Sequence, residues 1–221
     1  MYKNKKIFGL ITARANSKRL RNKNTLILSG KPVFYYTVIE ALKSKYLDQL
    51  FLSTNDHKII RRIKRFPKIK LFKRSHNLSK DKSKTEHLVL KFINEKAKKT
   101  DIVCLLQPTS PFRKSFDIDN SIKKMVDKKS KAIITVSKNF KNIKDSIKVK
   151  KNFYFSKCKK FVRNSFTVNG AFYAADIEFF KRKKTFITKN TLVHIMPKNR
   201  SLDIDTKEDF LLAKKIIKVK K

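Results

Sequence analysis

The residues best suited to chemistry form a basic segment that follows the first apolar run of the chain. Residues 14–24 read RANSKRLRNKN, which places five cations within ten positions, among short hydroxyl and amide side chains. Such groups bind a polyphosphate, together with backbone N–H groups in a turn. The segment matches neither a Walker A loop nor a dinucleotide-binding glycine motif. A generic basic loop is the alternative, and charge alone does not decide between the two.

A second candidate site is an acidic pair near the end of the chain. Asp203 and Asp205 alternate across Ile204, so in an extended segment both carboxylates share one face while Ile204 points into the core. Two carboxylates on one face suit Mg²⁺, which keeps waters and shares phosphate oxygens with a nucleotide. The alternative is that Asp205 or Thr206 caps the last helix.

The net charge of the chain is far from that of an ordinary domain. The 221 residues include 57 Lys and Arg against 17 Asp and Glu, which gives +40. One interpretation is a solvated lysine coat produced by A/T-rich codon drift, and the other is an electrostatic surface for nucleic acid. No RNA- or DNA-binding signature interleaves Arg with aromatic residues, so we expect no nucleic-acid partner.

The composition excludes several classes of protein. With 40% hydrophobic residues and 18 Phe the chain can bury a core, while 3 Gly and 5 Pro exclude collagen-like and linker architectures. Two cysteines cannot build a disulfide scaffold, which favours the cytoplasm. No apolar run approaches the ~18 to 20 residues that cross a bilayer, so we expect no membrane partner.

Apolar runs of strand length alternate with amphipathic segments of helix length. The predicted strands are 7–13, 50–53, 68–72, 102–106, 132–137, 167–174 and 192–196. The predicted helices are 32–45, 56–65, 83–98, 116–128 and 207–218. This alternation predicts a parallel sheet with helices on both faces, and such sheets bind ligands at the carboxyl ends of their strands. The loops after Ala13, Thr54, Phe72 and Leu106 are therefore expected to form the site.

Five ordered motifs resemble those of the acylneuraminate cytidylyltransferase family. Residues 13–24 resemble its signature A-R-x-x-S-K-x-[IL]-x-x-K-N, and residues 51–56 (FLSTND) resemble its I-V-S-T-D strand end. Residues 105–113 (LLQPTSPFR) nearly copy its L-L-Q-P-T-S-P-L-R. Residues 168–173 (VNGAFY) resemble its N-G-A-I-Y strand, and residues 201–209 (SLDIDTKED) resemble its S-x-D-I-D-T-x-x-D. The resemblance covers nearly all of the chain.

The resemblance implies a site for CTP, for a nine-carbon acidic sugar (a nonulosonic acid) and for Mg²⁺. It assigns catalysis to Arg14, Lys23 and Asp205, and the metal to Asp203 and Asp205. The implied nucleotide-binding residues are Arg14, Ser17, Lys18, Lys23, Asn24, Arg74 and Thr85, and the implied sugar-binding residues are Gln107, Asn169, Tyr173 and Lys159. It also implies a homodimer, in which the segment at about 138–166 reaches toward the second subunit.

The chain departs from the family pattern in three places. Arg19 stands where members often carry Gly, and Ser75 replaces a Pro that follows the arginine near the nucleotide. The stretch 158–163 (CKKFVR) lacks the Gln and Pro of the family's R-x-Q-x-L-P-like segment. We expect Lys159 to stand in for the arginine that binds the sugar carboxylate. The identity of the sugar is therefore left open by the sequence.

We expect a single domain over residues 1–221 with an α/β, Rossmann-like fold. Its central sheet should be mostly parallel, with helices on both faces and a small antiparallel excursion at about 138–166. The expected function is Mg²⁺-dependent transfer of CMP from CTP to a sugar of the sialic or legionaminic acid type, with release of pyrophosphate. The alternatives are a cytidylyltransferase for the eight-carbon sugar KDO, suggested by the stretch 17–20 (SKRL), and a non-enzymatic basic protein that binds nucleic acid.

Overall fold

The computed structural model describes residues 1–15, 17–74, 84–138, 147–150, 152–157 and 165–219. The strand order of its main sheet is β11-β7-β10-β6-β1-β4-β5. These strands are β1 (Ile7–Thr12), β4 (Gln49–Thr54), β5 (Ile69–Lys73), β6 (Ile102–Leu106), β7 (Ala132–Lys138), β10 (Phe166–Asp176) and β11 (Leu192–Ile195). Neighbouring strands are parallel except at β10, which is antiparallel to β6 and β7. The expectation of a mostly parallel sheet is confirmed.

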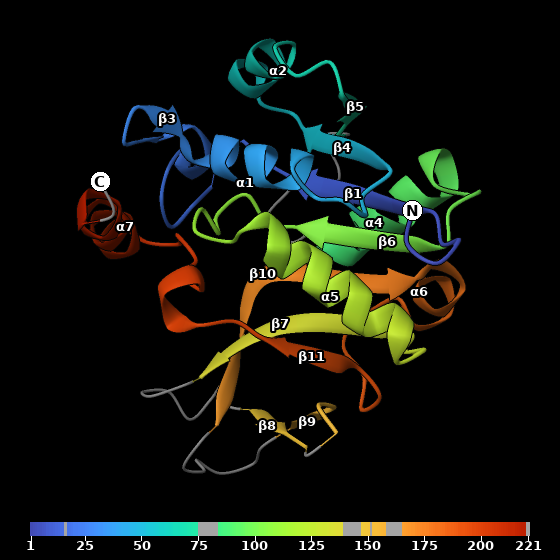
Figure 1. Ribbon diagram of the computed structural model, residues 1–221. Coiled ribbons are helices and arrows are strands. Elements are labelled where there is room, and N and C mark those ends of the chain that lie inside the picture. The colour runs from blue at the N-terminus through green and yellow to red at the C-terminus, as the bar shows by residue number, and fades with distance from the viewer. Residues whose placement is uncertain (16, 75–83, 139–146, 151, 158–164, 220–221) are drawn as a thin grey trace.

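Helices cover both faces of this sheet, as expected (Figure 1). In that view α1 (Val33–Leu42) and α5 (Ser115–Asp127) lie in front of the sheet, and α4 (Thr85–Lys96) and α6 (Ile177–Lys183) lie behind it. α2 (His57–Ile63) precedes β5, and α7 (Lys207–Val219) lies at the left edge, toward which β6 points. α6 was not predicted, because it follows β10 without a loop; Asp176 caps it by accepting from the Phe179 N–H at 3.0 Å.

Short elements complete the described structure. β2 (Ile27–Leu28) pairs with β3 (Lys31–Pro32), and two 3-10 turns span η1 (Lys23–Thr25) and η2 (Lys198–Arg200). β8 (Ile147–Val149) and β9 (Phe155–Lys157) form an antiparallel pair, and β8 also pairs with β10. This pair lies below the main sheet in Figure 1. It supplies the small antiparallel excursion that the sequence predicts.

Period-two alternation of apolar side chains divides the core into two layers. Along β6, Ile102, Cys104 and Leu106 belong to one layer, while Val103 and Leu105 belong to the other. All five are at most 4% exposed, as expected of a central strand that is covered on both faces. The first layer includes side chains of α1, α2 and α5, and the second includes those of α4 and α6.

A third, smaller core anchors the segment that carries the acidic pair. Ile204 is fully buried and packs in one cluster with Val33, Phe112 and Ala213. Its backbone N–H donates to the carbonyl oxygen of Thr109 at 2.8 Å. The segment before α7 is therefore held against the loop that follows β6.

Thr206, rather than Asp205, caps the first turn of α7. The Asp209 Oδ2 atom accepts from the Thr206 backbone N–H at 2.8 Å, and the Thr206 hydroxyl accepts from the Asp209 N–H at 3.3 Å. This reciprocal arrangement is a capping box. The Asp205 side chain is thereby left for contacts outside the helix.

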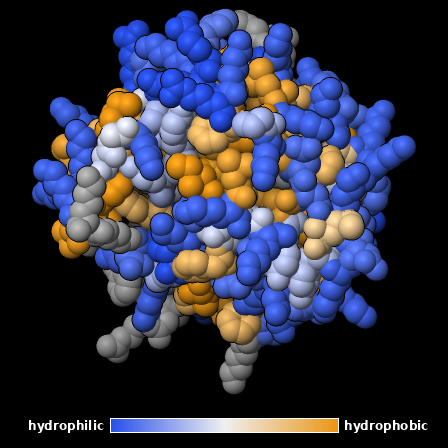
Figure 2. Space-filling model, turned by 45° about the horizontal axis from the view of Figure 1, so that its top comes forward, coloured by the Kyte–Doolittle hydropathy of each residue, from blue (hydrophilic) through white to orange (hydrophobic). Residues whose placement is uncertain are grey.

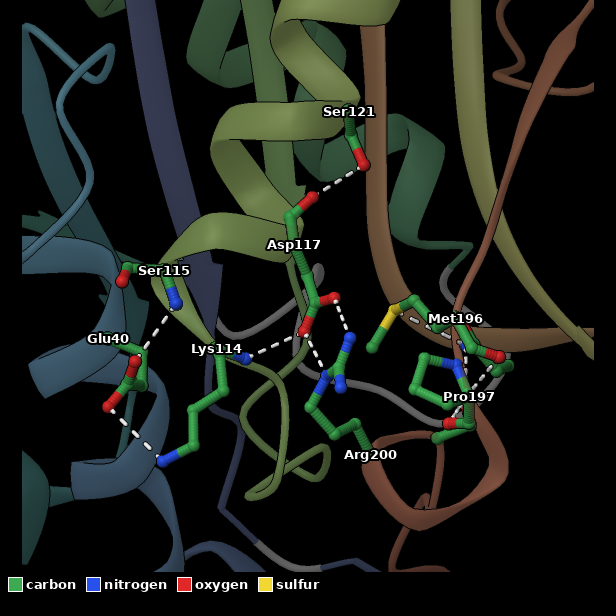
Figure 3. A network of polar contacts seen from close by, with 10 residues as sticks. Glu40, Lys114, Ser115, Asp117, Ser121, Met196, Pro197 and Arg200 are labelled. Atoms are coloured by element: carbon green, nitrogen blue, oxygen red, sulfur yellow. Dashed lines mark hydrogen bonds and ion pairs between the residues drawn. The ribbon is translucent and has the colours of Figure 1, made fainter.

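A buried ion pair holds the turn that precedes the acidic pair (Figure 3). Arg200 donates from Nε and Nη2 to the Asp117 carboxylate, each at 2.9 Å, and Asp117 is only 1% exposed. The same carboxylate accepts from the Lys114 backbone N–H at 3.0 Å, and Glu40 accepts from the Ser115 N–H at 2.9 Å. These contacts join α1, the start of α5 and the turn η2.

The excess positive charge lies on the surface. Arg113 is the one Lys or Arg that is buried among the residues that the structure describes. Hydrophilic side chains cover most of the face seen in Figure 2, with hydrophobic ones gathered toward its middle. Within the described ranges, no helix has the length and apolar character needed to span a membrane.

We expect Arg200→Met to lower the free energy of unfolding by about 3 kcal/mol, because it leaves the buried Asp117 carboxylate without its counter-ion. Urea unfolding followed by circular dichroism measures this change. Lys91→Met is the control, because it breaks an exposed pair with Glu95, 3.6 Å apart, and such pairs contribute about 0.5 kcal/mol or less. Equal losses in the two variants would contradict the stabilising role of the buried pair.

Candidate functional site

A cavity of about 710 Å³ lies at the carboxyl ends of β1 and β6. Its wall contains the acidic pair and, among the residues that the structure describes, five cations: Arg14, Arg19, Lys23, Arg74 and Lys84. The remaining wall residues are Thr12, Asn24, Thr85, Gln107, Pro108, Thr109, Val168, Gly170, Tyr173 and Ile187. This is the edge of the sheet at which a parallel α/β fold binds its ligands.

Two arginines of the wall lie close enough to influence each other. Burial, together with the positive charge of Arg14, lowers the pKa of Arg74 to about 10. Arg74 therefore keeps its charge at neutral pH. Two like charges that disfavour each other are stabilised by an anion that both can contact. The pair thus favours an anionic ligand such as a phosphate chain.

The basic loop is held in place by amide side chains. Asn24 is buried and donates from Nδ2 to the carbonyl oxygen of Arg14 at 2.9 Å. Asn55, which follows β4, accepts from the Ala15 backbone N–H at 2.9 Å. These two bonds fix the backbone at Arg14 and Ala15, and so fix the point from which the Arg14 side chain extends.

The predicted loop residues do not all reach the cavity. Arg14, Lys23 and Asn24 line it, as do Arg74 and Thr85 from later segments. Ser17 is buried and Lys18 is exposed, and neither is part of the wall. Direct contact of these two side chains with a nucleotide stays a prediction.

The Asp205 carboxylate lies between two cations of the basic loop. The Lys23 Nζ atom donates to Oδ1 at 2.6 Å, and a guanidinium nitrogen of Arg19 lies 2.8 Å from Oδ2. Lys23 is 19% exposed, whereas Arg19 is 71% exposed. Of the two roles considered from the sequence, this geometry supports a carboxylate that faces the cavity over one that caps α7.

Asp203 lies deeper in the same wall. Burial raises the pKa of its carboxyl, a hydrogen bond from Thr109 opposes this shift, and the negative charge of Asp205 adds to it. The Asp203 Oδ1 atom is buried and has no hydrogen-bond partner among the described residues. A buried carboxylate oxygen of this kind is satisfied by a positively charged ligand.

The acidic pair fits a hard divalent cation such as Mg²⁺, because its donor atoms are carboxylate oxygens. No group of three or more His, Cys, Asp and Glu side chains that could hold a metal ion occurs within the described ranges. Such an ion would therefore complete its coordination with water and with phosphate oxygens of a ligand, as Mg²⁺ usually does.

Gly170 brings the backbone of β10 close to the acidic pair. Its φ is +72°, and a Cβ at this position would lie 3.3 Å from the Asp203 Oδ2 atom and 3.4 Å from the Gln107 Oε1 atom. The register of β10 against β7 also shifts between Val168 and Tyr173. A Cβ here would therefore press on Asp203 and lie in contact with Gln107.

Asn169 supports this irregular backbone instead of lining the cavity. Its Oδ1 atom accepts from the Thr135 hydroxyl at 2.7 Å and from the Ala171 N–H at 3.1 Å. Its Nδ2 atom donates to the Ser201 hydroxyl at 3.0 Å. These bonds link β7, β10 and the segment before the acidic pair, and direct contact of Asn169 with a sugar stays a prediction.

Arg113 ties the carboxyl end of β6, at Gln107, to the middle of β10, next to Gly170. Its Nη1 atom donates to the Gln107 carbonyl oxygen at 3.3 Å and also to the carbonyl oxygen of Ala171. The Thr37 hydroxyl donates to the same Gln107 oxygen at 3.2 Å. The buried guanidinium group is therefore a spacer that sets the distance between β6 and β10 at the cavity.

The predicted sugar-side residues differ in where they lie. Gln107 and Tyr173 line the cavity, and Lys159 lies outside the described residues. Burial raises the pKa of the Tyr173 phenol above its ordinary value, and the charges of Asp203 and Glu86 add to this shift. Tyr173 therefore stays protonated and can donate a hydrogen bond to a ligand.

Several wall residues had no role assigned from the sequence. Gly170 and Thr109 lie inside quoted motifs, and a glycine within a strand is itself a signal of close backbone approach. Arg19 is one of the five cations of the basic segment and departs from the family pattern, and the sequence assigns it no role of its own. Lys84 and Ile187 lie in no motif, and packing alone brings them to the cavity.

The sequence of the chain is similar to those of known proteins. The sequence model of the family described as "Cytidylyltransferase" matches residues 8–219. An N-acylneuraminate cytidylyltransferase of Streptococcus agalactiae is 30% identical over 216 residues, which are 91% of this chain and 51% of that protein. The chain thus spans about half the length of this relative.

Two further comparisons cover nearly the full length of both chains. The CMP-N,N'-diacetyllegionaminic acid synthase of Legionella pneumophila is 29% identical over 226 residues, with 97% of each protein covered. A solved structure of a CMP:2-keto-3-deoxy-manno-octonic acid synthetase in complex with CTP superposes with a TM-score of 0.79 at 16% identity, covering 98% of this chain and 100% of that one. At this identity the superposition shows a shared fold.

We expect Gly170→Ala to destabilise the protein more than Gly30→Ala does. Both glycines have positive φ, so each substitution costs roughly 1 kcal/mol in the left-handed conformation. Only the Cβ at position 170 also meets the Asp203 and Gln107 side chains, since a Cβ at position 30 has open space around it. Urea unfolding should show about 1 kcal/mol of additional loss for Gly170→Ala; equal losses would contradict the close approach.

Proposed function

Since the chain belongs to the cytidylyltransferase family, we propose that it transfers CMP from CTP to a nine-carbon acidic sugar and releases pyrophosphate. The observation that carries this proposal is the meeting of a basic loop and an acidic pair in one cavity at the strand ends. The names of the Streptococcus and Legionella relatives support a sugar of the sialic or legionaminic acid type. We place the reaction in the cytoplasm.

The proposed reaction exchanges one bond at the α-phosphorus of CTP for another. The oxygen of the anomeric hydroxyl of the sugar bonds to this phosphorus, the bond to pyrophosphate breaks, and the hydroxyl proton is released. Catalysis then rests on positioning and on neutralisation of charge. Arg14 and Lys23 hold the triphosphate and stabilise the leaving pyrophosphate, and Arg74 adds a further charge beside Arg14.

The other proposed nucleotide contacts come from the same loop and from the start of α4. Asn24 fixes the backbone at Arg14 and presents its amide to the cavity, and Thr85 contacts the nucleotide from the start of α4. Ser17 and Lys18 are not part of the cavity wall. We therefore assign them a supporting role through the conformation and charge of the loop.

Asp203 and Asp205 are the proposed ligands of Mg²⁺. When bound, this ion neutralises charge on phosphate oxygens. The two carboxylates supply oxygens of the type that Mg²⁺ prefers. Asp205 is the carboxylate that contacts the basic loop, so it would hold the ion beside the cations that are proposed to bind the triphosphate.

Gln107 and Tyr173 are the proposed sugar contacts, since an amide and a protonated phenol suit the hydroxyl and acyl groups of such a sugar. Lys159 is proposed to bind its carboxylate. Asn169 contributes through the backbone that follows Gly170, because its Oδ1 atom accepts from the Ala171 N–H.

We also propose a homodimer, with the segment at about 138–166 at its interface. β8 pairs with the first residue of β10, Phe166, and β9 pairs with β8, below the main sheet in Figure 1. Light scattering coupled to size-exclusion chromatography measures the mass directly, and a monomer at all concentrations would exclude this assembly.

The deciding experiment measures the release of pyrophosphate from CTP in the presence of Mg²⁺. The acceptors are N-acetylneuraminate, legionaminate and KDO. Salt-dependent binding to random duplex DNA is measured beside it, because phosphate contacts weaken steeply as salt rises. Release with a nine-carbon acid supports the proposal, and release with KDO alone replaces it by the eight-carbon reaction. Tight DNA binding without any pyrophosphate release would make the basic surface the functional one.

We expect Lys23→Ala to lower kcat by about 10²- to 10³-fold, as loss of a single group that stabilises the transition-state charge does in other enzymes. The fold should remain, since Lys23 lies in the cavity wall. Lys215→Ala removes the same charge from an exposed position of α7 and should leave kcat unchanged. Normal turnover by folded Lys23→Ala would remove this residue from the mechanism.

A further inference from the structure

The acidic side chain that is proposed to bind the metal is already neutralised by the protein. Both oxygens of Asp205 are engaged by cations, Oδ1 by Lys23 at 2.6 Å and Oδ2 by Arg19 at 2.8 Å. A Mg²⁺ ion binds carboxylate oxygens at about 2.0–2.1 Å. Two cations this close repel a third that approaches the same two oxygens. A divalent ion therefore competes with Arg19 and Lys23 for Asp205.

The same two cations are placed to bind the triphosphate. Arg19 and Lys23 both line the cavity, beside Arg14. Arg19 is 71% exposed, so its side chain can turn with little cost in packing. A phosphate chain carries more negative charge than one carboxylate, and guanidinium groups bind phosphate in a bidentate manner. A bound triphosphate therefore draws both cations away from Asp205.

We propose that the metal site of this protein is gated by the nucleotide, with Arg19 as the gating residue. Without nucleotide, Arg19 and Lys23 hold Asp205 and keep a divalent ion out. When the triphosphate takes these cations, Asp205 becomes a metal ligand beside Asp203, whose Oδ1 atom has no hydrogen-bond partner in the described part of the chain. Arg19 is therefore a positioning residue that orders the binding of nucleotide and metal. This inference rests on the proposed function, because it takes the ligand to be a nucleoside triphosphate.

The first test measures Mn²⁺ binding to the nucleotide-free protein, by the loss of the free-ion signal in electron paramagnetic resonance. Arg19→Gly should bind Mn²⁺ about tenfold more tightly than wild type, because Oδ2 of Asp205 loses its competing cation. Arg21→Gly is the matched control, since it removes the same charge from an exposed position of the same loop that lies outside the cavity wall. Equal affinities in the two variants would overturn the proposal.

A double variant tests whether the Mn²⁺ ion that Arg19→Gly binds more tightly is bound at Asp205. Adding Asp205→Asn to Arg19→Gly should abolish the gain in Mn²⁺ affinity. If the gain survives, the ion does not bind at Asp205 and the proposal fails.

The second test measures the affinity for CTP in EDTA, without metal. If the triphosphate has to draw Arg19 and Lys23 away from Asp205, then removal of the Asp205 charge must in turn strengthen the binding of CTP. Asp205→Asn should bind CTP several-fold more tightly than wild type, because neither cation then has to leave a carboxylate. Asp203→Asn removes the same charge from a carboxylate that forms no ion pair with another described residue and feels Lys23 only from a greater distance, so its gain should be smaller. Equal gains in CTP affinity for the two variants would mean that only the overall charge of the site matters, and would overturn the proposal that Asp205 holds the two cations. Neither test involves a sugar or turnover, so a protein that passes both yet releases no pyrophosphate fails only the proposed function.

Discussion

The site depends on one electrostatic contact, the neutralisation of Asp205 by Lys23 and Arg19. Lys23 and Asp205 are 182 positions apart in the sequence, so their contact joins the loop after the first strand to the segment before the last helix. Burial of Ile204 and its hydrogen bond to Thr109 hold that segment against the loop after β6. The ion pair thus links the first of these loops to the last, while the apolar cluster around Ile204 and its hydrogen bond hold the last loop against the one after β6.

In a chain with 57 basic and 17 acidic residues, the acidic side chains are concentrated on structural tasks. Asp56 and Asp176 cap helices, Asp48 and Asp101 accept from the backbone N–H groups at the start of β1, and Asp117 holds Arg200. Among the acids of the described residues, Asp203 and Asp205 are the ones in the cavity wall. The basic excess, by contrast, is mostly surface charge, which can speed the capture of anionic substrates without a specific partner.

Much of the fold was predictable, because period and residue type are local properties. The apolar run Ile102–Leu106 gave a central strand with the expected bounds, and each predicted helix is present with its ends shifted by a few residues. The antiparallel direction of β10 was not predictable, because strand direction depends on where the chain returns to the sheet. In the site, Arg14, Lys23 and Asn24 were recognisable by motif and line the cavity, whereas Ser17 and Asn169 matched motifs equally well but are not part of its wall.

By itself the sequence determined the chemistry that this protein can offer: a loop rich in phosphate-binding groups, a pair of carboxylates with Ile204 between them, and the order of strands and helices that carries them. Tertiary structure decided which of these groups act together. It directs Asp205 to the basic loop while Thr206 caps α7, places Gly170 where a Cβ would lie 3.3 Å from the Asp203 Oδ2 atom, and sets Arg19 against the same carboxylate as Lys23. The physical reason is that these contacts join residues far apart in the chain, whose distances depend on how the core packs, and no local pattern encodes such distances.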